Sequence, residues 1–361
     1  MAQKLAVVLM NLGCPLQKED IEPFLYNFFM DENILSVPVF MRKILAGRIA
    51  KKRSTGAALN AYKELDYKSP LLENTIDQAV ALQDIIMDND VHGFDKVKVF
   101  VSMRYWPPTS EDTIEQVKDF GADHVLLLPL YPQFSTATTK SSLEDWVVKA
   151  KEMDLTCDIT PICCYPFDDG FIKASADRIE TAYNSAKRRR PDQKYRVLFS
   201  AHGLPEKTVK AGDPYQWQCE QSAKKIAAEL QIEDLDWEVC YQSRVGPLKW
   251  IGPSTEEALQ RAADDEKAVL IYPHAFVSEH VETLVEIEQE YKKLSKEMGV
   301  PDFVRVETVG THPIFIQGLA DIVKYTMYQR PQPALYCGHS RVSICPKQYK
   351  KCAFKILENV S

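Results

Sequence analysis

Residues 268–293, AVLIYPHAFVSEHVETLVEIEQEYKK, decide the fold class of this chain. The stretch begins with an apolar run of the length of a buried parallel strand and then breaks at Pro273 into a charged segment typical of a helix. Helical spacing would place three carboxylates on one face and a histidine in the first turn: Glu279, Glu282, Glu286 and His280. Acids grouped at the end of a strand are candidates for binding a metal ion or accepting protons; the simpler interpretation is a helix face in water.

A second stretch, residues 197–205 with the sequence VLFSAHGLP, favours the first of these interpretations. Here too an apolar strand ends abruptly, with His202 at its carboxyl tip and a Gly-Leu-Pro turn behind it. In open α/β sheets, ligands bind outside the carboxyl ends of the strands. We therefore expect His202 and the helix of Glu282 to emerge at the same edge of one sheet.

The composition is that of an ordinary globular protein, with 45% hydrophobic and 26% charged residues among 361. This length predicts two domains of about 150 residues each. A net charge of -7 argues against a nucleic-acid partner. The apolar run at the amino terminus is too short for a signal peptide or a membrane span, so we expect a cytoplasmic protein. In that compartment the nine cysteines predict thiols or metal ligands rather than disulfides.

Predicted strands and helices alternate along the chain. The strands are expected at 5–10, 96–102, 124–131, 158–163, 195–200, 237–241, 268–272 and 303–309. The main helices are expected at 18–29, 70–87, 110–120, 141–152, 169–187, 214–230, 255–262 and 278–298. Regular alternation indicates parallel sheets joined by right-handed crossovers. We predict an α/β fold of two Rossmann-like, doubly wound domains with a cleft between them.

The predicted limits of these parts follow from the same pattern. They are 1–153 for the N-terminal domain, 154–310 for the C-terminal domain with His202 and Glu282, 311–329 for a C-terminal helix and 330–361 for a tail with cysteines. Within the first domain, residues 24–53 carry many large apolar side chains followed by a basic run. They predict either an amphipathic helix on the core or an apolar lip that admits a flat ligand bearing carboxylates or contacts a bilayer.

Common phosphate-binding and nucleophile motifs are absent from the sequence. It contains no G-x-G-x-x-G, no G-x-x-x-x-G-K-[ST] and no G-x-S-x-G. Because the doubly wound fold hosts many unrelated activities, the residues of the site must decide the function.

Several motifs, taken together and in this order, resemble those of the ferrochelatase family, which inserts ferrous iron into a porphyrin at the end of haem synthesis. The resemblance runs from Leu5 to about Tyr328. It rests on five motifs: Asn11-Leu12-Gly13-x-Pro15, Leu128-Pro129-Leu130-Tyr131-Pro132-Gln133, Phe199-Ser200-Ala201-His202-Gly203-Leu204-Pro205, Gln242-Ser243-Arg244-Val245-Gly246-Pro247 with Trp250-x-Gly252-Pro253, and residues 275–284, AFVSEHVETL.

The resemblance implies roles for named side chains. His202 and Glu282 would face each other across the macrocycle as the catalytic residues that handle metal and protons, and Glu279, His280 and Glu286 would line an acidic path. The implied substrate-binding residues are Leu12, Lys52, Arg53, Tyr62, Ser69, Arg104, Tyr105, Trp250 and Phe276. For Trp250 and Phe276 the alternative is simple core packing. The implied partners are ferrous iron and either protoporphyrin IX or coproporphyrin III.

The tail contains the pattern Cys337-x7-Cys345-x6-Cys352, with His339 between the first two cysteines. Some members of the family hold a [2Fe-2S] cluster with three tail cysteines and one from the body, and here Cys163 or Cys164 would supply the fourth ligand. The alternatives are a Cys₃His zinc site that uses His339, or three unconnected thiols.

Two other functions compete with porphyrin metallation by iron. A non-catalytic protein of two-lobed α/β fold would bind a tetrapyrrole or an iron complex, but it would not need both His202 and Glu282 on one ligand. A chelatase for another metal would share the chemistry; such enzymes resemble this chain only weakly, being shorter and without the apolar lip.

Overall fold

The computed structural model describes residues 3–86, 90–244, 246, 248–329, 336–340 and 342–353. The predicted linker at Pro331 and Pro333 lies outside these residues. The contacts divide the chain into two compact units, Met1–Cys164 with Leu319–Ser343 and Tyr165–Gly318 with Ile344–Ser361. The first unit extends beyond the boundary expected at 153, because the fourth strand pairs with the third and so belongs to the first sheet.

The first unit contains a five-stranded sheet in which every pairing is parallel and the order is β2-β1-β3-β4-β9. Its strands are β1 (Lys4–Asn11), β2 (Lys96–Met103), β3 (His124–Pro129), β4 (Asp158–Cys164) and β9 (Tyr336–Cys337). The first four occur where alternation predicted them. β9 was not predicted, since two residues are too few to produce a pattern.

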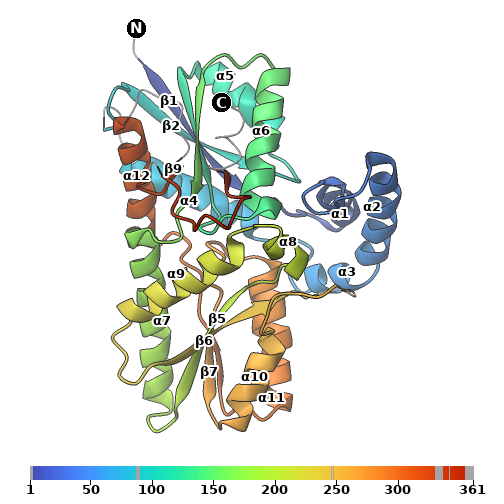
Figure 1. Cartoon of the computed structure of the whole chain (residues 1–361), viewed down its shortest axis with the longest axis vertical. Coiled ribbons are helices and arrows are strands. Elements are labelled where there is room, and N and C mark those ends of the chain that lie inside the picture. Colours follow the sequence, from blue (N-terminus) through green and yellow to red (C-terminus); the bar gives the residue numbers. More distant parts are fainter. Residues whose placement is uncertain are drawn as a thin grey trace. The chain divides into compact units, whose positions relative to one another are not determined.

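Helices cover both faces of this sheet. They are η1 (Lys18–Asp20), α1 (Ile21–Met30), α2 (Val39–Ser54), α3 (Ala57–Lys63), α4 (Leu71–Ile85), α5 (Ser110–Phe120), η2 (Thr136–Lys140), α6 (Ser141–Glu152) and α12 (Pro313–Tyr328). The chain returns from the second unit to the first within α12. α5 and α6 pack on one face through a core that includes Val8, Leu127 and Trp146. Figure 1 shows α2 projecting beyond the sheet and helices of this unit.

The second unit contains a four-stranded parallel sheet of order β6-β5-β7-β8. Its strands are β5 (Tyr195–His202), β6 (Asp236–Gln242), β7 (Ala268–Tyr272) and β8 (Phe303–Arg305). Its helices are α7 (Asp169–Arg189), α8 (Glu206–Lys210), α9 (Tyr215–Glu229), α10 (Thr255–Asp264), η3 (Glu282–Tyr291) and α11 (Lys292–Glu297). α7 and α9 lie on one side of the sheet and α10 and α11 on the other (Figure 1).

Local sequence signals account for the ends of several helices. Thr109 and Asp112 form a reciprocal capping box at the start of α5, and Gly121 ends this helix in the left-handed conformation at φ 71°. Ser254 and Glu257 form the same box at the start of α10. These caps bind backbone donors that the first turn of a helix leaves unpaired.

One segment predicted as ordinary helix, η3 in the second unit, is π-helical, and the π-helical turn η2 that precedes α6 in the first unit was not predicted. The same periodic pattern of apolar residues suits both geometries, so sequence could not separate them. β8 also ends at Arg305 rather than at 309. In the described residues no helix is both long enough and apolar enough to cross a bilayer.

Candidate active site

The second unit brings two strand tips together at one edge of its sheet. β5 pairs in parallel with β7, so both strands end on the same side. β5 ends at His202, and the segment that follows β7 leads through Phe276 to Glu282, the first residue of η3. Because β6 flanks β5 on one side and β7 flanks it on the other, the strand order reverses here, and such a point is where open α/β sheets bind ligands.

His202 and Glu282 contact each other directly, with Nδ1 of the imidazole 2.9 Å from Oε2 of the carboxylate. Their side chains are 37% and 29% exposed, so both can meet a ligand from solvent. The implied arrangement, in which a flat ring lies between them, is wrong for this structure because 2.9 Å leaves no space for one. The pair instead forms a single donor and acceptor group.

His280 and Phe276 extend the group. Nε2 of His280 lies 3.6 Å from the same Glu282 oxygen, and the Phe276 ring packs against the imidazole with centroids 4.6 Å apart. Trp250 lies beside the other tip, where a side chain at Gly203 would meet the backbone oxygen of Gln242 at 2.9 Å and the indole at 3.3 Å. Trp250 and Phe276 are both half-buried rather than fully enclosed in the core.

Glu286 is held by four hydrogen bonds. Its carboxylate accepts from the backbone N and hydroxyl of Ser243, at 2.8 and 2.5 Å, from Nε2 of Gln242 at 2.9 Å and from the Tyr291 hydroxyl at 3.1 Å. Sequence analysis did not assign roles to Gln242 and Ser243. The signal was available, because both stand at the end of β6, next to the tip of β5.

The two carboxylates differ in their protonation. Burial opposes ionisation of Glu282, but the charge and hydrogen bond of His202 outweigh it and hold the pKa of Glu282 well below its usual value. Burial and the neighbouring charge of Glu282 raise the pKa of Glu286, against the hydrogen bonds from Ser243 and Gln242. Two acids with pKa values pushed apart are suited to opposite steps of proton transfer.

Glu279 does not join this group, contrary to the helical spacing that placed it with Glu282 and Glu286. It precedes η3, because the helix begins at Glu282 rather than near Ser278. Its carboxylate accepts from Nη1 of Arg305 and the backbone N of Thr308, both at 2.9 Å. The role of Glu279 in an acidic path therefore has no support from these contacts.

The substrate-binding residues expected in the first unit lie in varied surroundings. Ser69 and Tyr105 are 1% and 3% exposed, and the Tyr105 hydroxyl donates to Asp31 at 2.6 Å. Tyr62 is also buried, and Leu12 is half-buried. Lys52 is exposed on α2. Arg53 stacks on the Phe29 ring at 5.5 Å.

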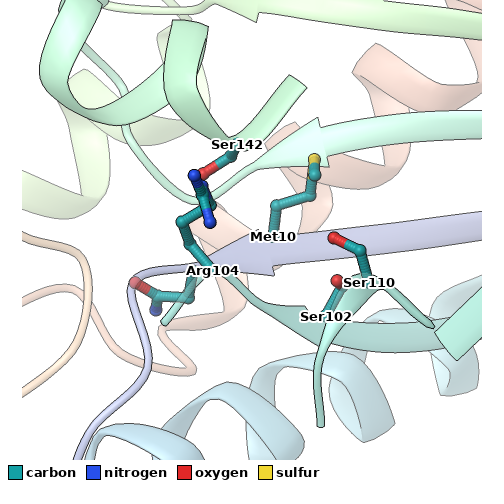
Figure 2. A pocket seen from close by; sticks show the side chains of 6 residues that line it. Met10, Ser102, Arg104, Ser110 and Ser142 are labelled. Atoms are coloured by element: carbon teal, nitrogen blue, oxygen red, sulfur yellow. The ribbon is translucent and has the colours of Figure 1, made fainter. Parts of the chain in front are cut away.

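Arg104 is engaged inside the first unit. Its Nη2 lies 3.4 Å from Asp31, its Nη1 lies 3.2 Å from Asp145 and its Nε donates to the Ser141 hydroxyl at 2.8 Å. It lines a hollow with Met10, Asn11, Ser102, Ser110 and Ser142, and it points toward Ser142 (Figure 2). This hollow is too narrow to admit a water molecule.

Three thiols gather in the first unit. The sulfur atoms of Cys163, Cys164 and Cys337 lie within 4.8 Å of one another, and all three side chains are buried. The pairing of β4 with β9 places Cys337 opposite Cys164. The other tail cysteines, Cys345 and Cys352, are buried and belong to the second unit, where the Cys345 sulfur lies 3.1 Å from the side-chain amide of Gln218. The His339 ring packs on Tyr325.

Comparison with known proteins identifies a family for this chain. The family model for ferrochelatase matches residues 4–327. A ferrochelatase of Caulobacter vibrioides is 45% identical over 353 residues, which cover 98% of each chain. A ferrochelatase of Wolbachia sp. subsp. Drosophila simulans is 46% identical over 319 residues, 88% of this chain and 98% of the relative. A ferrochelatase of Pelagibacter ubique is 42% identical over 349 residues, 97% of this chain and 98% of that one.

Solved structures support the fold. SirB from Bacillus subtilis, determined with Fe3+, superimposes with a TM-score of 0.54 at 16% identity, covering 90% of this chain and 96% of that one. The relatives at 42–46% identity are all named ferrochelatases, which favours an enzyme over a non-catalytic binding protein. The chain therefore belongs to the ferrochelatase family, whose members are lyases of haem biosynthesis that insert a metal ion into a porphyrin.

Proposed function

We propose that the chain inserts ferrous iron into protoporphyrin IX or coproporphyrin III, with His202 and Glu282 as the catalytic residues. The observation that carries this proposal is the 2.9 Å contact between the imidazole and the carboxylate at a solvent-accessible strand edge. Metallation requires that two pyrrole N–H protons leave as one Fe2+ ion forms four bonds to nitrogen. The site must therefore accept protons next to a place where a cation is tolerated.

We assign these tasks to particular atoms. With Glu282 ionised, Nδ1 of His202 donates to it, so Nε2 is the unprotonated nitrogen of the neutral imidazole. Nε2 accepts a pyrrole proton, and the negative charge of Glu282 stabilises the imidazolium that forms. Glu286, with its raised pKa, takes protons more readily than an exposed glutamate and passes them on to solvent. The same imidazole and carboxylates are ligands that a ferrous ion accepts while it loses water.

An anaerobic assay tests the proposal. The purified protein with ferrous iron and protoporphyrin IX should produce the absorbance of haem, and His202→Ala should abolish it. A parallel assay with coproporphyrin III compares kcat/KM and assigns the substrate. If the wild type binds porphyrin yet metallates neither substrate, or prefers cobalt or another divalent ion to iron, this proposal is wrong.

We also propose that Cys337, with Cys163 and Cys164, forms a thiolate site for a [2Fe-2S] cluster. Three buried sulfur atoms within 4.8 Å fit the donor set of such a cluster, which is held by cysteine thiolates. When bound, the cluster supplies an electron-transfer centre, and no step of metal insertion is assigned to it. The thiols would link the tail to β4.

Iron, sulfide and zinc analysis of anaerobically purified protein, with its visible spectrum, tests the thiolate site. We expect about two irons and two sulfides per chain, as a [2Fe-2S] cluster requires, and loss of both in Cys337→Ser and Cys163→Ser. Cys157→Ser is the matched control, because this partly exposed thiol stands just before β4. Stoichiometric zinc would favour the zinc alternative, and absence of both metals would leave unconnected thiols.

We further propose that α2 contacts an anionic membrane surface. Its first turns expose Val39, Phe40, Met41 and Ile44 at 56%, 75%, 50% and 43%. Lys43, Arg48, Lys51 and Lys52 are exposed on the same helix. Large apolar side chains beside lysines and arginines suit the boundary between acyl chains and acidic headgroups.

Co-sedimentation with vesicles tests this contact. We expect binding to vesicles of phosphatidylglycerol and phosphatidylcholine that weakens with salt, and loss of binding in the double variant Phe40→Ser, Met41→Ser. Ile76→Ser on α4, which is 44% exposed, is the control. If the double variant still binds vesicles but its KM for porphyrin rises, the apolar face serves the substrate instead.

A further inference from the structure

One half-buried arginine connects η3 to the segment that precedes it. Arg305 is the last residue of β8, and its side chain is 12% exposed. Its Nη1 donates to Glu279 at 2.9 Å and its Nε donates to Glu288 at 3.1 Å. Glu279 lies before the first residue of the π-helix, and Glu288 lies within the helix. One guanidinium therefore holds both the segment that leads into the π-helix and the helix itself.

Glu279 strengthens the connection through its other contacts. One of its oxygens accepts from the backbone N of Thr308 at 2.9 Å, just beyond β8, and the other accepts from the hydroxyl of Thr283, in the first turn of η3. The carboxylate therefore joins three parts of the chain: β8, the residues after it and the start of the π-helix. With these donors it is a structural anchor rather than a proton carrier.

A π-helix needs such an anchor more than an α-helix does. Its hydrogen bonds run from residue i to residue i+5, a geometry that is rare and usually limited to single turns. η3 extends over Glu282–Tyr291. Return of this segment to α-helical winding would rotate Glu282 about the helix axis relative to Glu288 and would break its 2.9 Å contact with His202.

We propose that Arg305 is a positioning residue, which holds η3 in its π-helical form through Glu279 and Glu288 and thereby keeps Glu282 against His202. The inference rests on the proposed roles of His202 and Glu282. The side-chain ion pairs of Arg305 are with Glu279 and Glu288, so its effect on the reaction is transmitted through the helix.

The same sheet offers a matched control. Arg196 has a side chain that is 11% exposed and pairs with Asp236, Glu238 and Asp265. It stands at the start of β5, whereas His202 stands at the end of that strand. Removing Arg196 therefore breaks a comparable network in the same sheet at the edge opposite the site.

The test compares Arg305→Met, Arg305→Lys and Glu288→Gln with Arg196→Met, in the full chain. We expect Arg305→Met to lower kcat for haem formation by about 10- to 100-fold, the cost of misplacing a catalytic group by roughly 1 Å, with KM for porphyrin nearly unchanged. Arg305→Lys, which keeps the charge, should recover part of the loss. Arg196→Met should lower thermal stability similarly and change kcat by less than about twofold.

Amide hydrogen exchange gives a readout that is independent of activity. Exchange over residues 282–291 should become faster in Arg305→Met and remain at the wild-type rate in Arg196→Met. If Arg305→Met does not fold, Arg305→Lys and Glu288→Gln carry the test, because Glu288 is 36% exposed and tolerates substitution.

The outcomes separate this inference from the proposed function. If Arg305 variants keep wild-type kcat and exchange while His202→Ala is inactive, the positioning role is wrong and the catalytic assignment stands. If His202→Ala retains turnover, the catalytic assignment is wrong, and the exchange of residues 282–291 alone decides whether Arg305 holds the π-helix.

Discussion

In the first unit β1 lies between β2 and β3, and in the second unit β5 lies between β6 and β7. Each sheet thus has a strand flanked by the next two strands of its own unit, and each places polar residues at the carboxyl tips. In the first unit Arg104 follows β2 and pairs with Asp31 and Asp145, and in the second unit His202 ends β5 and pairs with Glu282. The two edges share their topology and differ in their chemistry.

The two sheet edges differ in the kinds of charged and titratable groups that contact one another. In the first unit a guanidinium that is always charged faces two carboxylates, and Asp31 is only 2% exposed. In the second unit, within the described residues, the partners of Glu282 and Glu286 are imidazoles, hydroxyls and amides, with no lysine or arginine in ion-pair distance. Fixed charges that neutralise one another stabilise a fold, whereas an imidazole and a carboxylate can exchange protons near neutral pH.

The largest effect on the difference between the two sheet edges is expected when the charge of Glu282 is removed. Glu282→Gln should lower kcat by about 10²- to 10⁴-fold, the usual range for a group that assists proton transfer, while the free energy of unfolding changes little. Steady-state haem formation and urea unfolding measure both quantities. Glu290→Gln, an exposed position on the same helix, should behave as the wild type. Equal kcat for the two variants would contradict the catalytic role.

The reverse change, Asp31→Asn, should lower stability and spare the chemistry. Loss of a buried charge that accepts from Tyr105 and Ser141 and faces Arg104 should cost about 3 kcal/mol of unfolding free energy. Urea unfolding at pH 7 measures it, with the exposed Glu73→Gln as control. An unchanged midpoint would show that this network does not stabilise the first unit.

The stability difference between wild type and Asp31→Asn should also depend on pH. Burial opposes ionisation of Asp31, but hydrogen bonds from Ser141 and Tyr105 outweigh it and lower its pKa below the ordinary value of 3.8. The stabilisation by Asp31 is therefore complete above pH 3.8 and disappears as the pH falls through the lower folded-state pKa. Unfolding measured between pH 7 and pH 3 should show the difference narrowing only at the acidic end.

A smaller effect is expected at Glu286. Glu286→Gln should lower kcat roughly 10-fold, less than a direct acid–base partner, because protons can still leave through water. Since the pKa of Glu286 is raised, the wild-type rate should begin to fall at a higher pH during acidification than an ordinary glutamate would cause. The variant should lack this part of the pH–rate profile. If the rates of the wild type and of Glu286→Gln fell at the same acidic pH, the role assigned to Glu286 would be wrong.

The smallest effects are expected at the helix caps. They can be compared between the two units because α5 and α10 begin with the same kind of capping box. Thr109→Ala and Ser254→Ala each remove one capping box and should each cost about 1 kcal/mol. Neither should change KM or kcat. If Ser254→Ala alone reduced kcat, the start of α10 would have to be part of the site.

The sequence predicted the strands, and the meeting of His202 with the segment of Glu282 at one sheet edge, because both follow from short-range patterns. Apolar runs of strand length and a histidine at the tip of β5 can be read directly. The geometry of η3 could not be, since π-helical and α-helical segments share their apolar spacing, and Glu279 was placed on this helix although the helix begins only at Glu282. The partners Asp31 and Arg305 were also missed, because nothing near them in the chain indicates the distant residues that they bind.

The pairing of β9 with β4 has a consequence for shortened forms of the protein. β9 contributes only Tyr336 and Cys337, yet it occupies the outer side of β4 at Ile162 and Cys164. A chain that stopped at Gln329 would leave those backbone groups uncovered, and bare sheet margins readily recruit a strand from another molecule. Such a truncated protein should scatter more light on storage than the intact one, independently of whether its tail ever carried iron.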